Sequence, residues 1–158
     1  LIKMEAALGG FVEGIALDTS GRISEGSGQN LFLVRDQTIL TPPVSSSVLQ
    51  GITRDTILTL ARDLGIAVRE LDMPREMLYV ADEACFVGTA VEGTPIRSVD
   101  KITVGDGRRG PITTAIQKAF FDYVAGRTPD RHHWLTPVAV APTKAKAATV
   151  AYEAPSVV

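Results

Sequence analysis

Residues Arg22–Thr53 read RISEGSGQNLFLVRDQTILTPPVSSSVLQGIT, and this stretch predicts the centre of the fold. A short strand ends at Glu25 and a glycine-rich loop follows. The apolar run over residues 30–35 has no alternation of polar and apolar side chains, which predicts a strand that is buried on both faces. A turn then leads into a second strand over residues 38–41. Pro42 and the next proline end it, because proline cannot donate to a strand ladder.

The end of the same stretch predicts the start of a helix at Gly51-Ile52-Thr53. Asp55 lies in the first turn, where the helix dipole favours an anion. Gly65 is the expected residue just beyond the helix, where a left-handed conformation is common. The apolar face of this helix follows the i, i+3, i+4, i+7 pattern and consists of Ile57, Leu60, Ala61 and Leu64.

Helices and strands alternate along the remaining chain, which predicts an α/β domain. The expected elements are a helix within residues 1–13, a hairpin of 14–18 with 22–25, a strand over 66–70, a short helix from Pro74 to Ala81, an apolar strand from Glu83 that ends in Gly88-Thr89-Ala90, a strand pair of 94–99 with 101–104, and a helix from Pro111 to Gly126. Beyond Pro137 the composition shifts to Ala, Val, Pro, Thr and Lys. We therefore expect one domain over residues 1–137 and a loosely ordered tail over 138–158.

Length and composition favour one soluble globular domain, because the 158 residues are 45% hydrophobic and 22% charged. A net charge of −2 offers no basic surface for a nucleic acid. No apolar run approaches the roughly 20 residues of a membrane span, and no secretory signal is present, so we expect a cytoplasmic protein without a membrane partner. Leu1 is expected to be an internal position of a longer chain. The single cysteine, Cys85, excludes an intrachain disulfide and a multi-cysteine metal site.

Three short motifs could carry chemistry. The first amides of a helix that starts at Ile52-Thr53 suit a phosphate, although Gly51 could simply relieve the backbone there. Glu25, flanked by glycine, could bind a cation or lie in a solvated turn. The Gly88–Ala90 turn could present backbone amides to an anion, or it could be an ordinary turn after a buried strand.

Two other motifs are set aside. The segment Gly105-Asp106-Gly107-Arg108-Arg109-Gly110 lacks the Lys-Ser/Thr ending of a phosphate-binding loop, so it is interpreted as a turn and helix entry. His132 and His133 have no obvious third ligand or helical i, i+4 partner, so no metal site is expected.

The motifs taken together resemble branched-chain amino acid aminotransferases, over about residues 1–137. The matching segments, in the order of that family, are EGIALD at 13–18, ISEGSGQNLFLV at 23–34, LTPP at 40–43, LQGITRD at 49–55, RE-x-LY-x-ADE at 75–83, F-x-GTA-x-E at 86–92 and RGPIT at 109–113. The resemblance implies the C-terminal large domain of a fold-type IV pyridoxal 5′-phosphate enzyme, a mixed-sheet pseudobarrel with helices outside. It also implies a homo-oligomer, dimer or hexamer, in the full-length protein.

The resemblance also implies residue roles. Glu25 would hold the protonated pyridine nitrogen of the cofactor, which keeps the ring an electron sink. Ile52 and Thr53 would bind the phosphate, with the Thr89 hydroxyl as a further donor, and Leu49 would pack against the ring. The amides of Gly88, Thr89 and Ala90 would hold the α-carboxylate of the substrate.

The sequence departs from the family at two points. Gln29 stands where the family often has Glu. The Schiff-base lysine of the family falls upstream of Leu1, together with the small N-terminal domain, and Lys3 does not match its motif. We therefore expect no catalytic lysine in this chain and no activity from the chain alone.

The leading hypothesis is transamination between leucine, isoleucine or valine and 2-oxoglutarate, in branched-chain amino acid biosynthesis. A D-amino acid aminotransferase or an aminodeoxychorismate lyase of the same fold is the first alternative, although EGIALD and GTA-x-E favour the branched-chain enzyme. A non-catalytic binding or assembly module is the second. A substrate panel separates the enzymes from one another, and the coding sequence upstream of Leu1 separates an enzyme from a module.

Overall fold

A mixed five-stranded sheet in the order β5-β4-β3-β6-β7 is the centre of the structure, a computed structural model that describes residues 1–138. β4 and β5 run parallel, and the other neighbouring strands are antiparallel. The strands are β3 (Asn30–Arg35), β4 (Thr38–Thr41), β5 (Val68–Glu70), β6 (Glu83–Val87) and β7 (Thr94–Pro95). The α/β class and the mixed sheet predicted from the sequence are confirmed.

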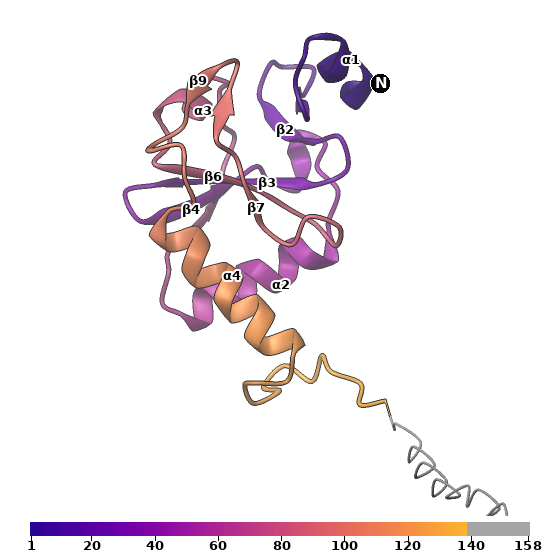
Figure 1. Ribbon diagram of the computed structural model, residues 1–158, viewed down its shortest axis with the longest axis vertical. Coiled ribbons are helices and arrows are strands. Elements are labelled where there is room, and N and C mark those ends of the chain that lie inside the picture. The colour runs from indigo at the N-terminus through magenta and orange to yellow at the C-terminus, as the bar shows by residue number, and fades with distance from the viewer. Residues whose placement is uncertain (139–158) are drawn as a thin grey trace, which may run out of the picture.

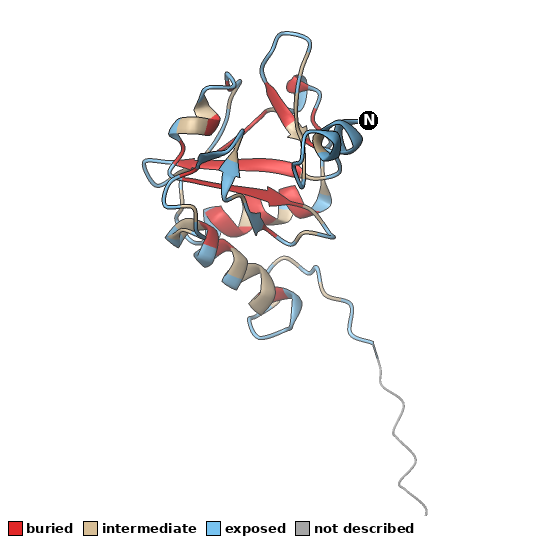
Figure 2. Cartoon of the chain, turned by 45° about the horizontal axis from the view of Figure 1, so that its top comes forward, coloured by how far each residue is buried: buried red, intermediate tan, exposed pale blue. Residues whose placement is uncertain are grey.

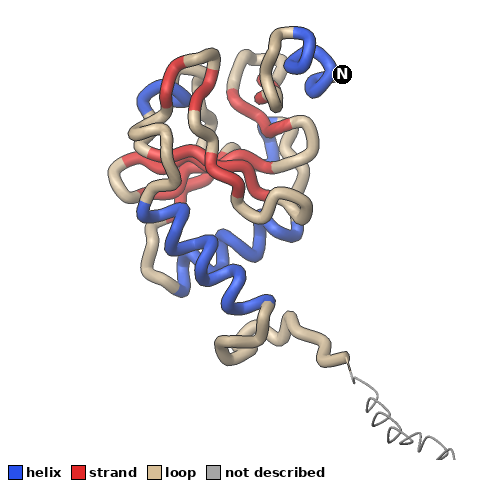
Figure 3. Tube along the Cα trace, viewed as in Figure 1, coloured by secondary structure: helices blue, strands red, loops and turns tan. Residues whose placement is uncertain are grey.

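Two layers cover the sheet (Figure 1). The long helices α2 (Ile52–Asp63) and α4 (Pro111–Val124) lie on one face. On the other face lie two hairpins and the shorter helices, which Figure 3 shows in the same view. These elements are α1 (Ile2–Leu8), the hairpin of β1 (Ile15–Leu17) with β2 (Ile23–Gly26), α3 (Met77–Val80), and the hairpin of β8 (Ser98–Val99) with β9 (Ile102–Thr103).

The core lies on both faces of β3 and β6, whose residues are buried except for Arg35 (Figure 2). Alternate side chains of β3 enter opposite clusters, as the pleat requires. Phe32 and Val34 pack toward the α2 and α4 side, whereas Leu31 and Leu33 pack with Ile23 of β2 and its neighbours. The sequence prediction of a strand covered on both faces is therefore confirmed for residues 30–35, with Arg35 as the exposed end.

Both long helices end as the sequence predicts. Gly65, at φ +71°, and Gly126, at φ +66°, each stand one residue beyond the C-cap in the left-handed conformation. Ile57, Leu60 and Ala61 are buried on the predicted face of α2. Leu64 is an exception, because it is the C-cap itself and its side chain is 49% exposed.

Two predicted elements were wrong in their boundaries. Pro74 does not open α3, because it forms an isolated bridge with Arg22 and the helix starts at Met77. The amide of Ile23 donates to the carbonyl of Met73, so the chain before α3 is held extended beside β2. The predicted strand over 94–99 divides into β7 and β8, since β7 continues the main sheet and β8 turns back onto β9.

After α4 the chain forms a compact turn around Asp130. The Asp130 carboxylate accepts hydrogen bonds from the Tyr123 hydroxyl and from the amides of Trp134 (2.9 Å) and Leu135 (3.1 Å). The predicted tail lies outside the described residues from position 139 onward. In the part of the chain that the structure describes, no helix is long and apolar enough to cross a membrane.

Candidate functional site

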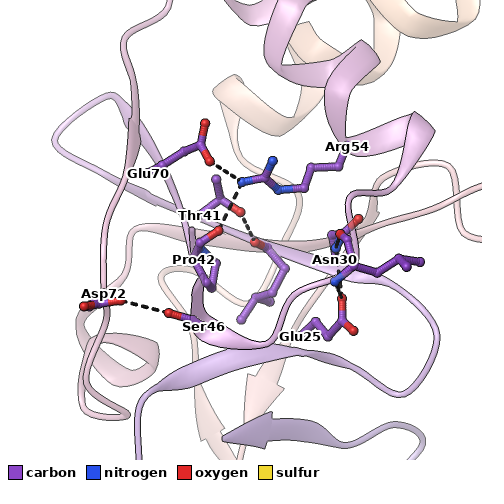
Figure 4. Close-up of polar contacts among 10 residues, drawn as sticks. Glu25, Asn30, Thr41, Pro42, Ser46, Arg54, Glu70 and Asp72 are labelled. Atoms are coloured by element: carbon purple, nitrogen blue, oxygen red, sulfur yellow. Dashed lines mark hydrogen bonds and ion pairs between the residues drawn. The ribbon is translucent and has the colours of Figure 1, made fainter. Parts of the chain in front are cut away.

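Glu25, near the end of β2, is the carboxylate of the candidate site. One oxygen, Oε2, accepts hydrogen bonds from the Leu49 amide (3.0 Å) and from Nδ2 of Asn30 (3.0 Å), as Figure 4 shows for Asn30. The side chain is half-buried. The other oxygen, Oε1, accepts no hydrogen bond from residues 1–138. Glu25 therefore has a fixed direction and a free acceptor for a cationic ligand.

The N-terminus of α2 is the second part of the site. Gly51 is the N-cap and supplies no side-chain cap. The amides of Ile52, Thr53 and Arg54 have no acceptor among the described residues, because the first helical bond runs from Asp55 to the Gly51 carbonyl. These free donors lie at the positive end of the dipole of a 12-residue helix. The arrangement suits an anion such as a phosphate.

Asn30, the first residue of β3, joins these two parts. Its Nδ2 donates to the Leu49 carbonyl (2.9 Å) as well as to Glu25. A Cβ added to Gly51 would lie 2.3 Å from Oδ1 of Asn30, so position 51 has no space for a side chain. Sequence reasoning gave Asn30 no role. The available signal was a polar residue at the start of a strand that is otherwise apolar.

The Gly88–Ala90 turn lies at the same edge of the sheet. It follows β6, whose last residue, Val87, is directly opposite Asn30. Thr89 and Ala90 are exposed, and the Gly88 carbonyl accepts from the Val91 amide (3.2 Å). Within residues 1–138 no hydrogen bond joins this turn to Glu25 or to α2. The pairing of Val87 with Asn30 brings the turn to the start of β3.

Leu49 also lies at this edge, where its side chain is 71% exposed. The exposed side chain of Ile52 accompanies it, whereas Thr53 is buried. Gln29 approaches the turn from the β3 side, since a Cβ on Gly88 would lie 3.5 Å from the Gln29 Cβ. The sequence-predicted residues are thus divided among three segments that meet around Asn30.

Arg54 supports the segment between β4 and α2. Its Nη2 donates to the Pro42 carbonyl (3.1 Å) and to Oε2 of Glu70 (2.8 Å) on β5 (Figure 4). The Arg54 side chain is 7% exposed and that of Glu70 is 40% exposed. Ser46 donates to Asp72 (2.8 Å) in the same segment. These contacts hold the loop that carries Leu49 and the start of α2.

The other chemical candidates lie elsewhere. Burial raises the pKa of Cys85 to about 12, so its thiol is not a nucleophile near neutral pH. His132 stacks on Trp134 with centroids 4.5 Å apart, and its Nε2 contacts Asp63 at 2.7 Å, at the opposite end of α2 from Ile52. Gly105, at φ +49°, forms a turn close to the Asp82 carbonyl, as interpreted from the sequence.

The two groups suit opposite charges. Asn30 links the Glu25 carboxylate to the loop that leads into α2. A protonated ring nitrogen suits the carboxylate, and an anionic group suits the free amides at the start of α2. Glu25 and the start of α2 therefore fit a protonated pyridine ring that carries a phosphate.

Comparisons with known proteins match this chain to one enzyme family. The family described as amino-transferase class IV matches residues 1–99. The chain is 56% identical over 138 residues to the branched-chain-amino-acid aminotransferase of Salmonella typhimurium, covering 87% of this chain and 45% of that relative. The chain thus spans about half the length of the curated relatives that it matches.

Solved structures show the same similarity. A branched-chain amino acid aminotransferase from Escherichia coli superposes with a TM-score of 0.84 at 56% identity, covering 86% of this chain and 46% of that one. The enzyme from Thermobaculum terrenum, in its PLP form, gives a TM-score of 0.85 at 40% identity, covering 89% of this chain and 46% of that one. The family match over residues 1–99, with Glu25, the α2 N-terminus and the Gly88–Ala90 turn within it, shows that this chain belongs to the class IV aminotransferases.

Proposed function

We propose that this chain is the C-terminal, cofactor-binding part of a cytoplasmic branched-chain-amino-acid aminotransferase. The reaction is amino transfer between leucine, isoleucine or valine and 2-oxoglutarate, with pyridoxal 5′-phosphate as cofactor. The observation that carries the proposal is the free Glu25 oxygen beside the uncapped N-terminus of α2. The names of the relatives and the PLP form of the Thermobaculum terrenum enzyme support it.

Different residues bind different parts of the cofactor. Glu25 binds the protonated ring nitrogen, and the amides of Ile52 and Thr53 bind the phosphate. The Thr89 hydroxyl is a further phosphate donor, and the exposed Leu49 side chain packs on the ring. When bound, pyridoxal phosphate supplies an electron sink for the electrons released at the α-carbon of the amino acid. A carboxylate at the ring nitrogen keeps that nitrogen protonated.

The Gly88–Ala90 turn binds the substrate in this proposal. Its small residues let backbone amides approach the α-carboxylate of an amino acid or a 2-oxo acid. Because β6 places the turn opposite the start of β3, the substrate would lie over the Glu25 edge of the sheet. The contribution of the turn is orientation of the substrate.

The Schiff-base lysine belongs, in this proposal, to the part of the relatives that this chain does not span. Lys3 is directed to another partner, since its Nζ lies 3.9 Å from the Glu13 carboxylate. An open groove of about 1300 Å³ runs between the α1–β1 region and the 94–101 segment. Ile2 and Phe11 are exposed along it. This partly apolar surface suits packing of the remaining polypeptide, and the complete protein is proposed to be a homo-oligomer.

The experiment compares the chain alone with the chain joined to the N-terminal half of its Escherichia coli relative. Both proteins are given pyridoxal 5′-phosphate, and transamination is measured on L-leucine, L-isoleucine, L-valine and D-alanine with 2-oxoglutarate. We expect no turnover and no covalently bound cofactor from the chain alone, because in this proposal none of its lysines is the Schiff-base nucleophile. The joined protein is expected to use the branched-chain L-amino acids.

The outcomes are distinct. Turnover by the chain alone, with its mass confirmed, would contradict the proposed division of the site. A preference of the joined protein for D-alanine would favour a D-amino acid aminotransferase. A folded joined protein that binds no cofactor would favour a non-catalytic module.

A further inference from the structure

We propose that Asn30 is a positioning residue that sets the direction of the Glu25 carboxylate and fixes it against the segment that leads into α2. The inference rests on the proposed function, in which Glu25 and the start of α2 bind the two ends of one ligand. Asn30 itself touches neither half of that ligand. Its role is to hold Glu25 and the residues 49–53 at one spacing.

Both N–H groups of the Asn30 amide are used, and each goes to a different segment. One donates to Oε2 of Glu25 on β2 at 3.0 Å, and the other donates to the Leu49 carbonyl at 2.9 Å. The Leu49 amide then donates back to the same Glu25 oxygen at 3.0 Å. The three residues form a closed triangle of hydrogen bonds, so Glu25 cannot rotate without breaking a contact to the loop.

The remaining polar atom of Asn30 faces the start of α2. Its Oδ1 occupies the space that a side chain at position 51 would need, which keeps Gly51 close to β3. The backbone of Asn30 pairs with Val87, the residue before the Gly88–Ala90 turn. A single residue at the start of β3 therefore contacts Glu25 (Figure 4), lies against Gly51 at the start of α2, and pairs with the strand that precedes the substrate turn.

The chemistry of the position calls for an uncharged side chain with two donors. Asn30 is 4% exposed, so water does not replace a lost donor without cost. A serine hydroxyl has one hydrogen and can satisfy only one of the two acceptors. An aspartate would place a second carboxylate against Glu25. Asparagine meets the requirement of two donors without adding charge.

The experiment is a double-mutant cycle on this chain with pyridoxine 5′-phosphate as the probe, a ligand that needs no Schiff-base lysine. The proteins are wild type, Asn30→Ala, Glu25→Ala and the double variant, and affinity is measured by calorimetry. Thr41→Val is the matched control, because it removes a buried hydrogen bond to the Leu31 carbonyl (2.9 Å) on the same sheet. Asn30→Ser is the second variant should Asn30→Ala not fold.

We expect each single variant to weaken binding by about tenfold, and the double variant to bind less than about threefold more weakly than Glu25→Ala. Thr41→Val should lower stability and leave the affinity unchanged. A double variant that binds about 100-fold more weakly than wild type would overturn the inference, because the two single losses would then be independent. The same holds if Asn30→Ala binds as tightly as wild type while Glu25→Ala binds more weakly. Wild-type affinity of Glu25→Ala, or no binding by wild type, would instead contradict the proposed function.

Hydrogen exchange of the Leu49 amide decides the positioning role without any ligand. In the ligand-free chain this amide should exchange faster in Asn30→Ala and at the wild-type rate in Thr41→Val. Exchange of Leu49 that is unchanged in Asn30→Ala would overturn the inference whatever the affinities show.

Discussion

At the scale of single residues, Glu83 stabilises the start of α4 from inside the sheet. Glu83 is 5% exposed, and its carboxylate accepts hydrogen bonds from the amides of Ile112 (2.9 Å) and Thr113 (2.8 Å). It thus caps a helix whose own N-cap, Gly110, has no side chain. A Cβ at Gly110 would lie 2.1 Å from the Glu83 carboxyl carbon, which explains the glycine at that position.

We predict that Glu83→Ala destabilises the chain by about 3 kcal/mol, because it leaves a part-buried and a buried amide at a helix N-terminus without an acceptor. Glu76→Ala, an exposed glutamate with no side-chain cap contact, is the control and should change stability by less than about 0.5 kcal/mol. Urea denaturation measures both. A loss below about 1 kcal/mol in Glu83→Ala would contradict the capping role.

Cys85 gives a second prediction at this scale. Burial raises the pKa of its thiol to about 12, so almost no thiolate is present at pH 8. Labelling with 5,5′-dithiobis(2-nitrobenzoic acid) at pH 8 should therefore proceed only as fast as the chain opens, and should become rapid in denaturant. Rapid labelling of the native chain would show that the thiol is accessible.

The sequence predicts a role for Glu25 through the family motif ISEGSGQNLFLV and predicts none for Asn30, for a physical reason. Without that motif, a carboxylate beside Gly26 at a strand end could equally lie in a solvated turn. The role of Asn30 depends on contacts with Glu25 and with Leu49, which is 19 residues away along the chain. Such a role exists only after β2, β3 and the α2 loop have packed together.

At the scale of elements, the attachment of the α2 N-terminus to the sheet depends on Arg54. Its single Nη2 contacts both the Pro42 carbonyl and Glu70, which links the end of β4 to β5. We predict that Arg54→Met costs about 2 kcal/mol of stability and speeds hydrogen exchange in residues 49–53. Arg62→Met on the exposed side of the same helix is the control. Equal effects of the two substitutions would contradict this role.

The turn after α4 should respond to pH through Asp130. Its hydrogen bond from Tyr123, together with those from the Trp134 and Leu135 amides, lowers the pKa of Asp130. A lowered folded-state pKa means that the stabilisation is present above the unfolded value, near 4, and is lost as pH falls through the folded value. Asp130→Asn should therefore lose less stability than wild type between about pH 5 and pH 2. Trp134 fluorescence measures unfolding of both proteins at each pH. An unchanged slope would contradict it.

The sequence predicts the boundary of an element correctly where a local conformational preference alone determines that boundary. Gly65 and Gly126 fixed the ends of α2 and α4 because a left-handed residue stops a helix in any context. Pro74 was misleading because its neighbour, Met73, is held by a hydrogen bond to β2, a contact that no local pattern contains. The division of residues 94–99 likewise depends on tertiary pairing, because β7 pairs with β6 and β8 pairs with β9.

At the scale of the whole molecule, the fold brings three separate stretches of sequence to one edge of the sheet. β2 supplies Glu25, the loop after β4 supplies Leu49 and the start of α2, and β6 supplies the Gly88–Ala90 turn. The alternation of strands and helices predicted the α/β class, and the family resemblance predicted the mixed sheet. The structure confirms both. The spacing of the three stretches required the structure, because it depends on the pairing of β3 with β6 and on the hydrogen bonds among Glu25, Asn30 and Leu49.

The most direct test of the proposed cofactor site is the binding of pyridoxine 5′-phosphate to this chain, monitored residue by residue in ¹H–¹⁵N NMR spectra. We predict that the largest shifts occur at Glu25, at Leu49 to Arg54 and at Gly88 to Ala90, and that Glu25→Gln weakens binding by about tenfold or more. Inorganic phosphate should move the α2 start alone. No shift at Glu25 or at the start of α2 on addition of pyridoxine 5′-phosphate, or shifts confined to another surface, would contradict the assignment of this edge as the cofactor site.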